Sequence, residues 1–101
     1  MKEFTYREVG EIEERDQVVK RDLMLFIDDR VYQLSVGTHQ FIDSLKQYNK
    51  QFDEELQLDD NILPMDSVVD LGQVVEKIGR LPWEIVAPYL VKQDQVETDS
   101  T

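Results

Sequence analysis

The stretch Gln17–Ile27, QVVKRDLMLFI, decides the fold of this chain because it reads as a β-strand with a two-residue turn on each side. Residues 15–16 (RD) precede the stretch and residues 28–29 (DD) follow it, and aspartate tolerates the backbone conformations of tight turns. We therefore expect Gln17–Ile27 to be the central strand of a three-stranded antiparallel β-meander. The alternative is a charged helix over residues 3–21, whose middle is rich in glutamate.

The register that these turns impose supports the meander. Side chains alternate between the two faces of a strand, so a wrong register would mix apolar with polar positions. With the predicted turns, the apolar face carries Phe4, Tyr6, Ile12, Val19, Leu23, Leu25, Ile27, Tyr32, Leu34 and Val36. The polar face carries Thr5, Arg7, Glu11, Glu13, Lys20, Asp22, Gln33 and Ser35. This separation is the main argument for the strand interpretation.

Individual pairs follow from the same register. Ile12 is expected opposite Val19, and Glu11 is expected opposite Lys20 as a cross-strand ion pair. Two features fit the register poorly. Glu8 falls on the apolar face. The polar face carries a small apolar patch made of Met24, Phe26 and Val31.

An amphipathic helix is expected directly after the meander, at about residues 39–56. Thr38 is a suitable N-cap for it, because its hydroxyl can accept a backbone N–H of the first turn. The apolar stripe of this helix contains Phe41, Leu45, Tyr48 and Phe52. We expect the helix to lie across the apolar face of the sheet, which a meander alone cannot shield from water.

Two further helices are expected after a polar connection. Ser67 and Asp70 have the spacing of a capping box for a second helix, with Gly79 as its left-handed terminator. A short third helix over residues 82–86 and an irregular segment then follow. The predicted fold class is therefore α+β, a three-stranded antiparallel meander covered on one face by two or three helices in the order βββαα(α).

The composition points to a small, soluble, cytoplasmic protein. The chain has 101 residues, which suits one domain, placed at residues 1–92, with a disordered acidic tail at residues 93–101. It has no cysteine, and its longest apolar run, residues 23–27, is far too short to span a membrane. The first residues also lack the apolar segment of a secretory signal.

Negative charge is concentrated in the second half of the chain. The net charge is −11, and residues 51–101 hold 12 acidic against 3 basic residues. No Lys or Arg occurs from residue 51 to residue 76. A field of this sign repels nucleic acid and attracts basic surfaces, so direct nucleic-acid binding is not expected.

The residue types give little support to catalysis, a cofactor or a metal. The single histidine, His39, is expected to be exposed in the first turn of a helix, and there is no cysteine to serve as a nucleophile. The carboxylates at residues 53–60 offer oxygen ligands for calcium or magnesium, but the spacing of a calcium-binding loop is absent. Trp83 is expected in the core rather than at a contact surface. We expect a non-enzymatic protein without a cofactor.

A solubilising surface is the simplest interpretation of the acidic residues. A more specific interpretation is that they imitate the phosphates of nucleic acid and occupy a basic site on a nucleic-acid-handling protein. The contact residues would be Asp53, Glu54, Glu55, Asp59, Asp60, Asp66 and Asp70. In size and charge the chain is similar to small acidic inhibitors of phages and mobile elements, such as anti-CRISPR and anti-restriction proteins. The first hypothesis is a protein-binding inhibitor or regulator of this kind.

The alternative hypothesis is a structural or assembly protein. Residues 25–45, LFIDDRVYQLSVGTHQFIDSL, loosely resemble the start of small phage tail-assembly chaperones. That resemblance implies contacts through apolar surface, either through the patch of Met24, Phe26 and Val31 or through Trp83 and its neighbours. The acidic residues would then serve solubility alone.

Overall fold

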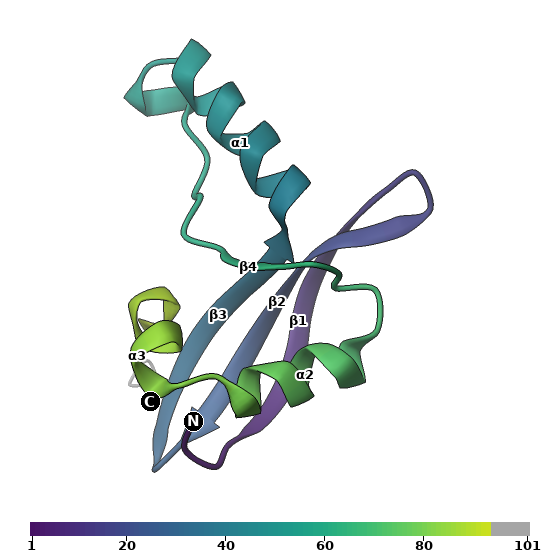
Figure 1. Ribbon diagram of the computed structural model, residues 1–101. Helices are drawn as coiled ribbons and strands as arrows, with labels where there is room; N and C mark the ends of the chain where they lie inside the picture. The colour runs from purple at the N-terminus through teal and green to yellow at the C-terminus, as the bar shows by residue number, and fades with distance from the viewer. Residues whose placement is uncertain (94–101) are drawn as a thin grey trace.

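Three long strands form an antiparallel meander in the computed structural model, which describes residues 1–93 (Figure 1). These are β1 (Thr5–Glu14), β2 (Gln17–Ile27) and β3 (Arg30–Thr38), in that order across the sheet. The four residues of the two connecting turns all have positive φ, between 50° and 67°. Positive φ at both central positions is the type I′ geometry, whose twist matches that of the flanking strands. The predicted meander and its turns are confirmed.

The sheet continues past β3 with two short strands that the sequence did not reveal. β4 (Leu63–Met65) pairs in parallel with the end of β3, and β5 (Val91–Lys92) pairs antiparallel with its beginning. Runs of two or three residues carry no periodic signal, so the pattern of apolar residues could not predict them. The expected disordered tail lies outside the described residues, except for Gln93.

The register of the first hairpin matches the prediction at its ends and differs in its middle. Tyr6 faces Leu25 as expected, but one extra residue on β1 and one on β2 shift the pairing by one position between them. Ile12 therefore faces Lys20 and not Val19, and its side chain is 39% exposed. The two β-bulges compensate each other, which is why the turn itself keeps its two residues.

The same shift overturns the expected ion pair between Glu11 and Lys20. Glu11 faces Arg21 instead, and the Lys20 ammonium lies 3.1 Å from a carboxylate oxygen of Asp22. Arg21 points to the covered side of the sheet and is buried. Glu8, which fitted the apolar face poorly, also pairs with the Arg21 guanidinium.

The apolar face of the sheet is covered by α2 (Leu71–Arg80) and α3 (Trp83–Val86) (Figure 1). The main core consists of buried apolar side chains from the strands and these helices. Its members are Leu23, Leu25, Ile27, Leu34, Val36, Leu63, Met65, Val68, Val74, Ile78 and Val86. Trp83 is half-buried and packs against this core, as does Phe4 from the segment before β1.

The first helix, α1 (His39–Gln51), does not cover the sheet, so its predicted position is wrong. It begins directly after Thr38 at the end of β3, and Figure 1 shows it extending away from the sheet. Ile42 is its single buried residue. Reversal over the sheet would need a connecting turn between strand and helix, and the chain has none here. The face left open is covered by α2, which residues 66–70 separate from β4.

The ends of the helices differ from the prediction in detail. Thr38 caps α1 as expected, since its Oγ1 accepts the N–H of Phe41 at 3.1 Å. That helix ends at Gln51, and a separate 3-10 turn, η1 (Glu54–Leu56), follows it. A short α3 followed by a 3-10 turn, η2 (Ala87–Tyr89), fits the predicted third helix and irregular segment.

The predicted capping box does not start α2. Ser67 Oγ accepts only the N–H of Val69, whereas Asp70 is the N-cap residue and accepts the N–H of Gln73 at 3.3 Å. Gly79 is not a left-handed terminator, because the helix passes through it and no described glycine has positive φ. None of the described helices combines the length and the apolar composition that crossing a bilayer requires.

Candidate functional site

The segment from α1 to β4 forms a projection that we call the arm, defined as residues 39–62 (Figure 1). It consists of α1, η1 and the connection at residues 57–62. Asn49 holds the connection against the helix: its Oδ1 accepts the N–H of Leu58 at 2.8 Å, and its Nδ2 donates to the Leu58 carbonyl at 2.9 Å. Gln57 Nε2 donates to the Asn49 carbonyl at 3.2 Å. These bonds make helix and connection one unit.

The base of the arm is held against the sheet by close packing around Gly37. A Cβ atom at Gly37 would lie 3.0 Å from Ile62 Cγ2 and 3.2 Å from the Val19 carbonyl oxygen. Ile62 and Ile42 are both buried there. The missing side chain of Gly37 thus allows the returning connection to approach β3, which sets the direction in which the arm leaves the sheet.

Three of the predicted contact carboxylates lie together at the tip of the arm. Asp53 immediately precedes η1, and Glu54 and Glu55 form its first turn. All three side chains are exposed, and within residues 1–93 they form no ion pair or side-chain hydrogen bond. They are therefore free to meet a basic surface.

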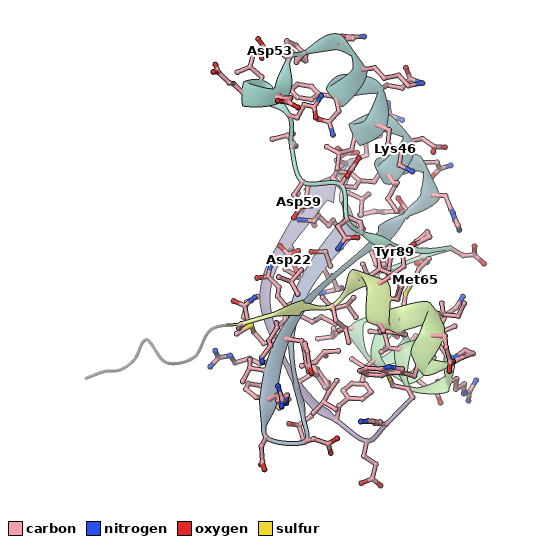
Figure 2. The ribbon with its side chains drawn as sticks, turned by 90° about the vertical axis from the view of Figure 1, so that its left-hand side faces the viewer. Asp22, Lys46, Asp53, Asp59, Met65 and Tyr89 are labelled. Carbon is pink, nitrogen blue, oxygen red and sulfur yellow. The ribbon has the colours of Figure 1, made fainter. Side chains whose placement is uncertain are left out.

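Two more of the predicted carboxylates lie on the connection. Asp59 and Asp60 are exposed, and Asp59 Oδ1 also accepts the N–H of Asn61 at 3.0 Å, which shapes the turn there. Figure 2 shows Asp53 and Asp59 on the same side of the arm, with Lys46 of α1 on the other side. Lys46 therefore does not lie between Asp53 and Asp59 on the arm.

The last two predicted contact residues follow β4 and lie outside the arm, although Asp66 lies against its first residue, His39. Asp66 follows β4 and is exposed, with its Oδ1 3.3 Å from Nε2 of His39. Asp70 is used as the N-cap of α2. The structure therefore brings five of the seven predicted residues together on the arm and leaves Asp66 and Asp70 beside the sheet.

An apolar patch at the end of the arm was missed by reasoning from the sequence. We call it the tip patch, and it consists of Tyr48, Phe52, Leu56 and Leu58. The rings of Tyr48 and Phe52 stack with centroids 4.4 Å apart and are 37% and 39% exposed, while both leucines are 53% exposed. The helical stripe was expected to pack on the sheet. The absence of a connecting turn after Thr38 was the signal that it could not.

Arg21 belongs to a second cluster of charges, which holds the fold together. Its Nε donates to the Val68 carbonyl and its Nη2 to the Val69 carbonyl, both at 2.7 Å. Its Nη1 pairs with Glu8 and lies 3.2 Å from Glu11. The guanidinium thereby ties the first hairpin to the segment before α2, and each of its three nitrogens is used in a bond within the fold.

Other chemistry-bearing groups do not converge. Among residues 1–93, His, Asp and Glu side chains do not gather in groups of three or more that could hold a metal ion. His39 is the first residue of α1 and is exposed. On the open face of the sheet, Phe26 faces Val31 across the second hairpin and is 39% exposed, whereas Met24 and Val31 are half-buried.

Comparison with protein-family models, with curated proteins and with solved structures finds no match to this chain.

Proposed function

We propose that this protein is a small, cytoplasmic, non-enzymatic inhibitor or regulator that uses its acidic arm to occupy a basic site on a nucleic-acid-handling partner protein. The observation that carries the proposal is the exposure of five carboxylates along one projecting element, none of them in an ion pair within residues 1–93. The residues are Asp53, Glu54, Glu55, Asp59 and Asp60.

Two properties of the arm distinguish it from an ordinary solubilising surface. The first is the absence of Lys and Arg from residue 51 to residue 76; within residues 1–93 none of the five carboxylates forms an ion pair. The second is projection from the sheet, which lets the arm enter a concave basic site (Figure 1). At physiological salt the attraction acts over about 8–10 Å, so it speeds the encounter with a basic partner.

A capture experiment tests the proposal with variants that change the net charge equally. The arm variant carries Asp53→Lys, Glu54→Lys and Glu55→Lys. The control variant carries Glu3→Lys, Glu13→Lys and Glu14→Lys, which are exposed positions on and beside β1. Each purified chain is used as bait in a host lysate, and captured proteins are compared at about 50 and 200 mM salt, a range over which phosphate-like contacts weaken steeply.

The expected result is a partner that both the natural chain and the control variant capture and that the arm variant loses. Capture should fall sharply at the higher salt, and a DNA or RNA oligonucleotide should displace the chain from the purified partner. A partner that the arm variant retains at both salt concentrations would contradict the proposal.

A second candidate function is a structural or assembly protein that makes its contact through the open face of the sheet. The exposure of Phe26 beside Val31 favours it. In this case Phe26→Asp abolishes capture of the partner while the arm variant retains it. Trp83 is the weaker candidate for that contact, since its side chain packs against the core.

A further inference from the structure

The apolar side chains of α1 are buried near the start of the helix and exposed near its end. Ile42 is buried near β3, whereas the tip patch is left exposed beyond it. Large side chains exposed next to one another on a small protein mark a contact surface more often than isolated ones do. The tip patch therefore has the properties of a contact surface.

We infer that the tip patch is the apolar centre of the arm's contact surface and that its occupant is a cationic amphipathic helix of the partner protein. The inference rests on the proposed function, because both concern the same arm. It adds the secondary structure and the side-chain types of the partner segment that contacts the arm.

Charge identifies the occupant as basic. Leu56 lies in the same 3-10 turn as Glu54 and Glu55, and Leu58 directly precedes Asp59. Carboxylates thus adjoin the apolar side chains along the chain, and protein interfaces combine an apolar centre with a polar rim. A partner that satisfies both parts needs apolar side chains flanked by Lys or Arg. If the arm only imitated the charge of nucleic acid, the apolar side chains of the tip patch would have no apolar partner in the complex.

The shape of the patch favours a helix. Tyr48 lies in the last turn of α1 and Phe52 is the residue that caps its C-terminus. Their adjacent rings form a ridge at the end of the helix, of the kind that packs against a second helix. A strand would need an open sheet edge. The edge offered by β1 is interrupted by the bulge at Val9 and carries many charged side chains, both of which disfavour added strands.

A second copy of the chain is a poor occupant. The chain has a net charge of −11, and two arms docked at their tips would bring the carboxylates of Asp53, Glu54 and Glu55 against each other. Like charges placed across an interface oppose association.

Two synthetic peptides test the inference on the full chain. Both contain only Lys and Leu, in equal proportions, and have about 18 residues, or five helical turns. In the patterned peptide all leucines lie on one helical face, and in the scrambled peptide they do not. Affinities are measured by calorimetry at about 150 mM salt, where exposed charges are screened beyond about 8 Å. Backbone NMR shifts of the labelled chain locate the bound peptide.

Phe52→Ser is the test variant and Phe26→Ser its matched control, because both phenylalanines are 39% exposed and they lie on different surfaces. We expect the patterned peptide to bind about tenfold tighter than the scrambled one and to shift the amides of the tip patch. Phe52→Ser should lower the affinity for the patterned peptide by about 30-fold, the loss typical of a central aromatic residue in an interface. Phe26→Ser should leave its affinity unchanged.

Equal affinities for the two peptides, or equal effects of the two phenylalanine variants, would overturn the inference. If the arm variant then still binds both peptides more weakly than the natural chain does, the proposed function stands although the inference about the tip patch fails. If the arm variant leaves binding of the patterned peptide unchanged while Phe52→Ser removes it, the proposed function fails instead. Self-association that Phe52→Ser abolishes, measured by sedimentation, would assign the patch to a second copy and also overturn the inference.

Discussion

At the scale of single residues, the fold depends most on Arg21. A guanidinium is costly to remove from water unless its nitrogens are bonded, and Arg21 is buried to 7% exposure with two backbone carbonyls and two carboxylates around it. The β-bulge at Val9 is what brings Glu11 into line with Arg21. A register drawn from apolar positions alone could not show this, because it is the burial of a charge that requires the shift.

Replacement of Arg21 by alanine is expected to destabilise the protein by about 3–5 kcal/mol, since it leaves buried carbonyls and a carboxylate without their partner. Arg30→Ala is the matched control, because Arg30 is exposed, and it should change stability by less than about 0.5 kcal/mol. Urea unfolding measures both. A loss below about 1 kcal/mol for Arg21→Ala would show that the cluster is not needed for the fold.

The turn residues predict a stabilising change. Asp29 has φ of 63°, a left-handed conformation that glycine adopts without steric cost. We expect Asp29→Gly to stabilise the chain by about 0.5 kcal/mol, the gain being reduced by the larger entropy of glycine in the unfolded state. Asp29→Val should instead destabilise it by about 1–2 kcal/mol. Thermal unfolding of the two variants gives the comparison, and a more stable valine variant would refute the turn geometry.

At the scale of elements, the two long helices share an amphipathic pattern and differ in what covers it. The helix α2 buries Val74 and Ile78 against the sheet, while α1 buries Ile42 alone. Amphipathicity shows that a helix has an apolar face and does not show what lies against that face. The connection before each helix decides it: residues 66–70 separate α2 from β4, whereas no residue separates α1 from β3.

Truncation of side chains in the two helices should therefore have unequal effects on stability. We expect Ile78→Ala to cost about 2–5 kcal/mol, as a cavity in a packed core does. Phe52→Ala should cost less than about 1 kcal/mol, mainly from its stacking with Tyr48. Equal losses in urea unfolding would mean that α1 is packed as firmly as α2.

Two glycines predict changes of opposite sign. At Gly37 an added methyl group would press on Ile62 and on the Val19 carbonyl, so Gly37→Ala should cost about 1–3 kcal/mol. Gly79 lies within α2, and a Cβ atom added there would be 3.9 Å from its nearest neighbour, Phe4 Cε1, so Gly79→Ala should stabilise by about 0.5–1 kcal/mol through helix propensity. Unfolding midpoints that move in the same direction for both variants would contradict the account of the arm's base.

At the scale of the whole molecule, α2 and α3 cover one face of the sheet, and the arm projects from the sheet without such a cover. The sequence was sufficient to predict the meander, its turns and the Thr38 cap, because those follow from local residue types and alternation. It was not sufficient for β4 and β5, which pair through tertiary contacts, or for the free position of α1. The acidic contact residues were predicted as one group, yet the fold places Asp66 and Asp70 beside the sheet.

The free position of α1 is the claim on which the proposed contact surface depends, and solvent relaxation NMR tests it most directly. A soluble paramagnetic agent is added to the labelled chain, and relaxation of side-chain protons is compared between the tip patch and Ile78. The account predicts strong relaxation enhancement at Phe52, Leu56 and Leu58 and almost none at Ile78. Protection of the tip patch equal to that of Ile78 would contradict it, because α1 would then lie against the rest of the protein.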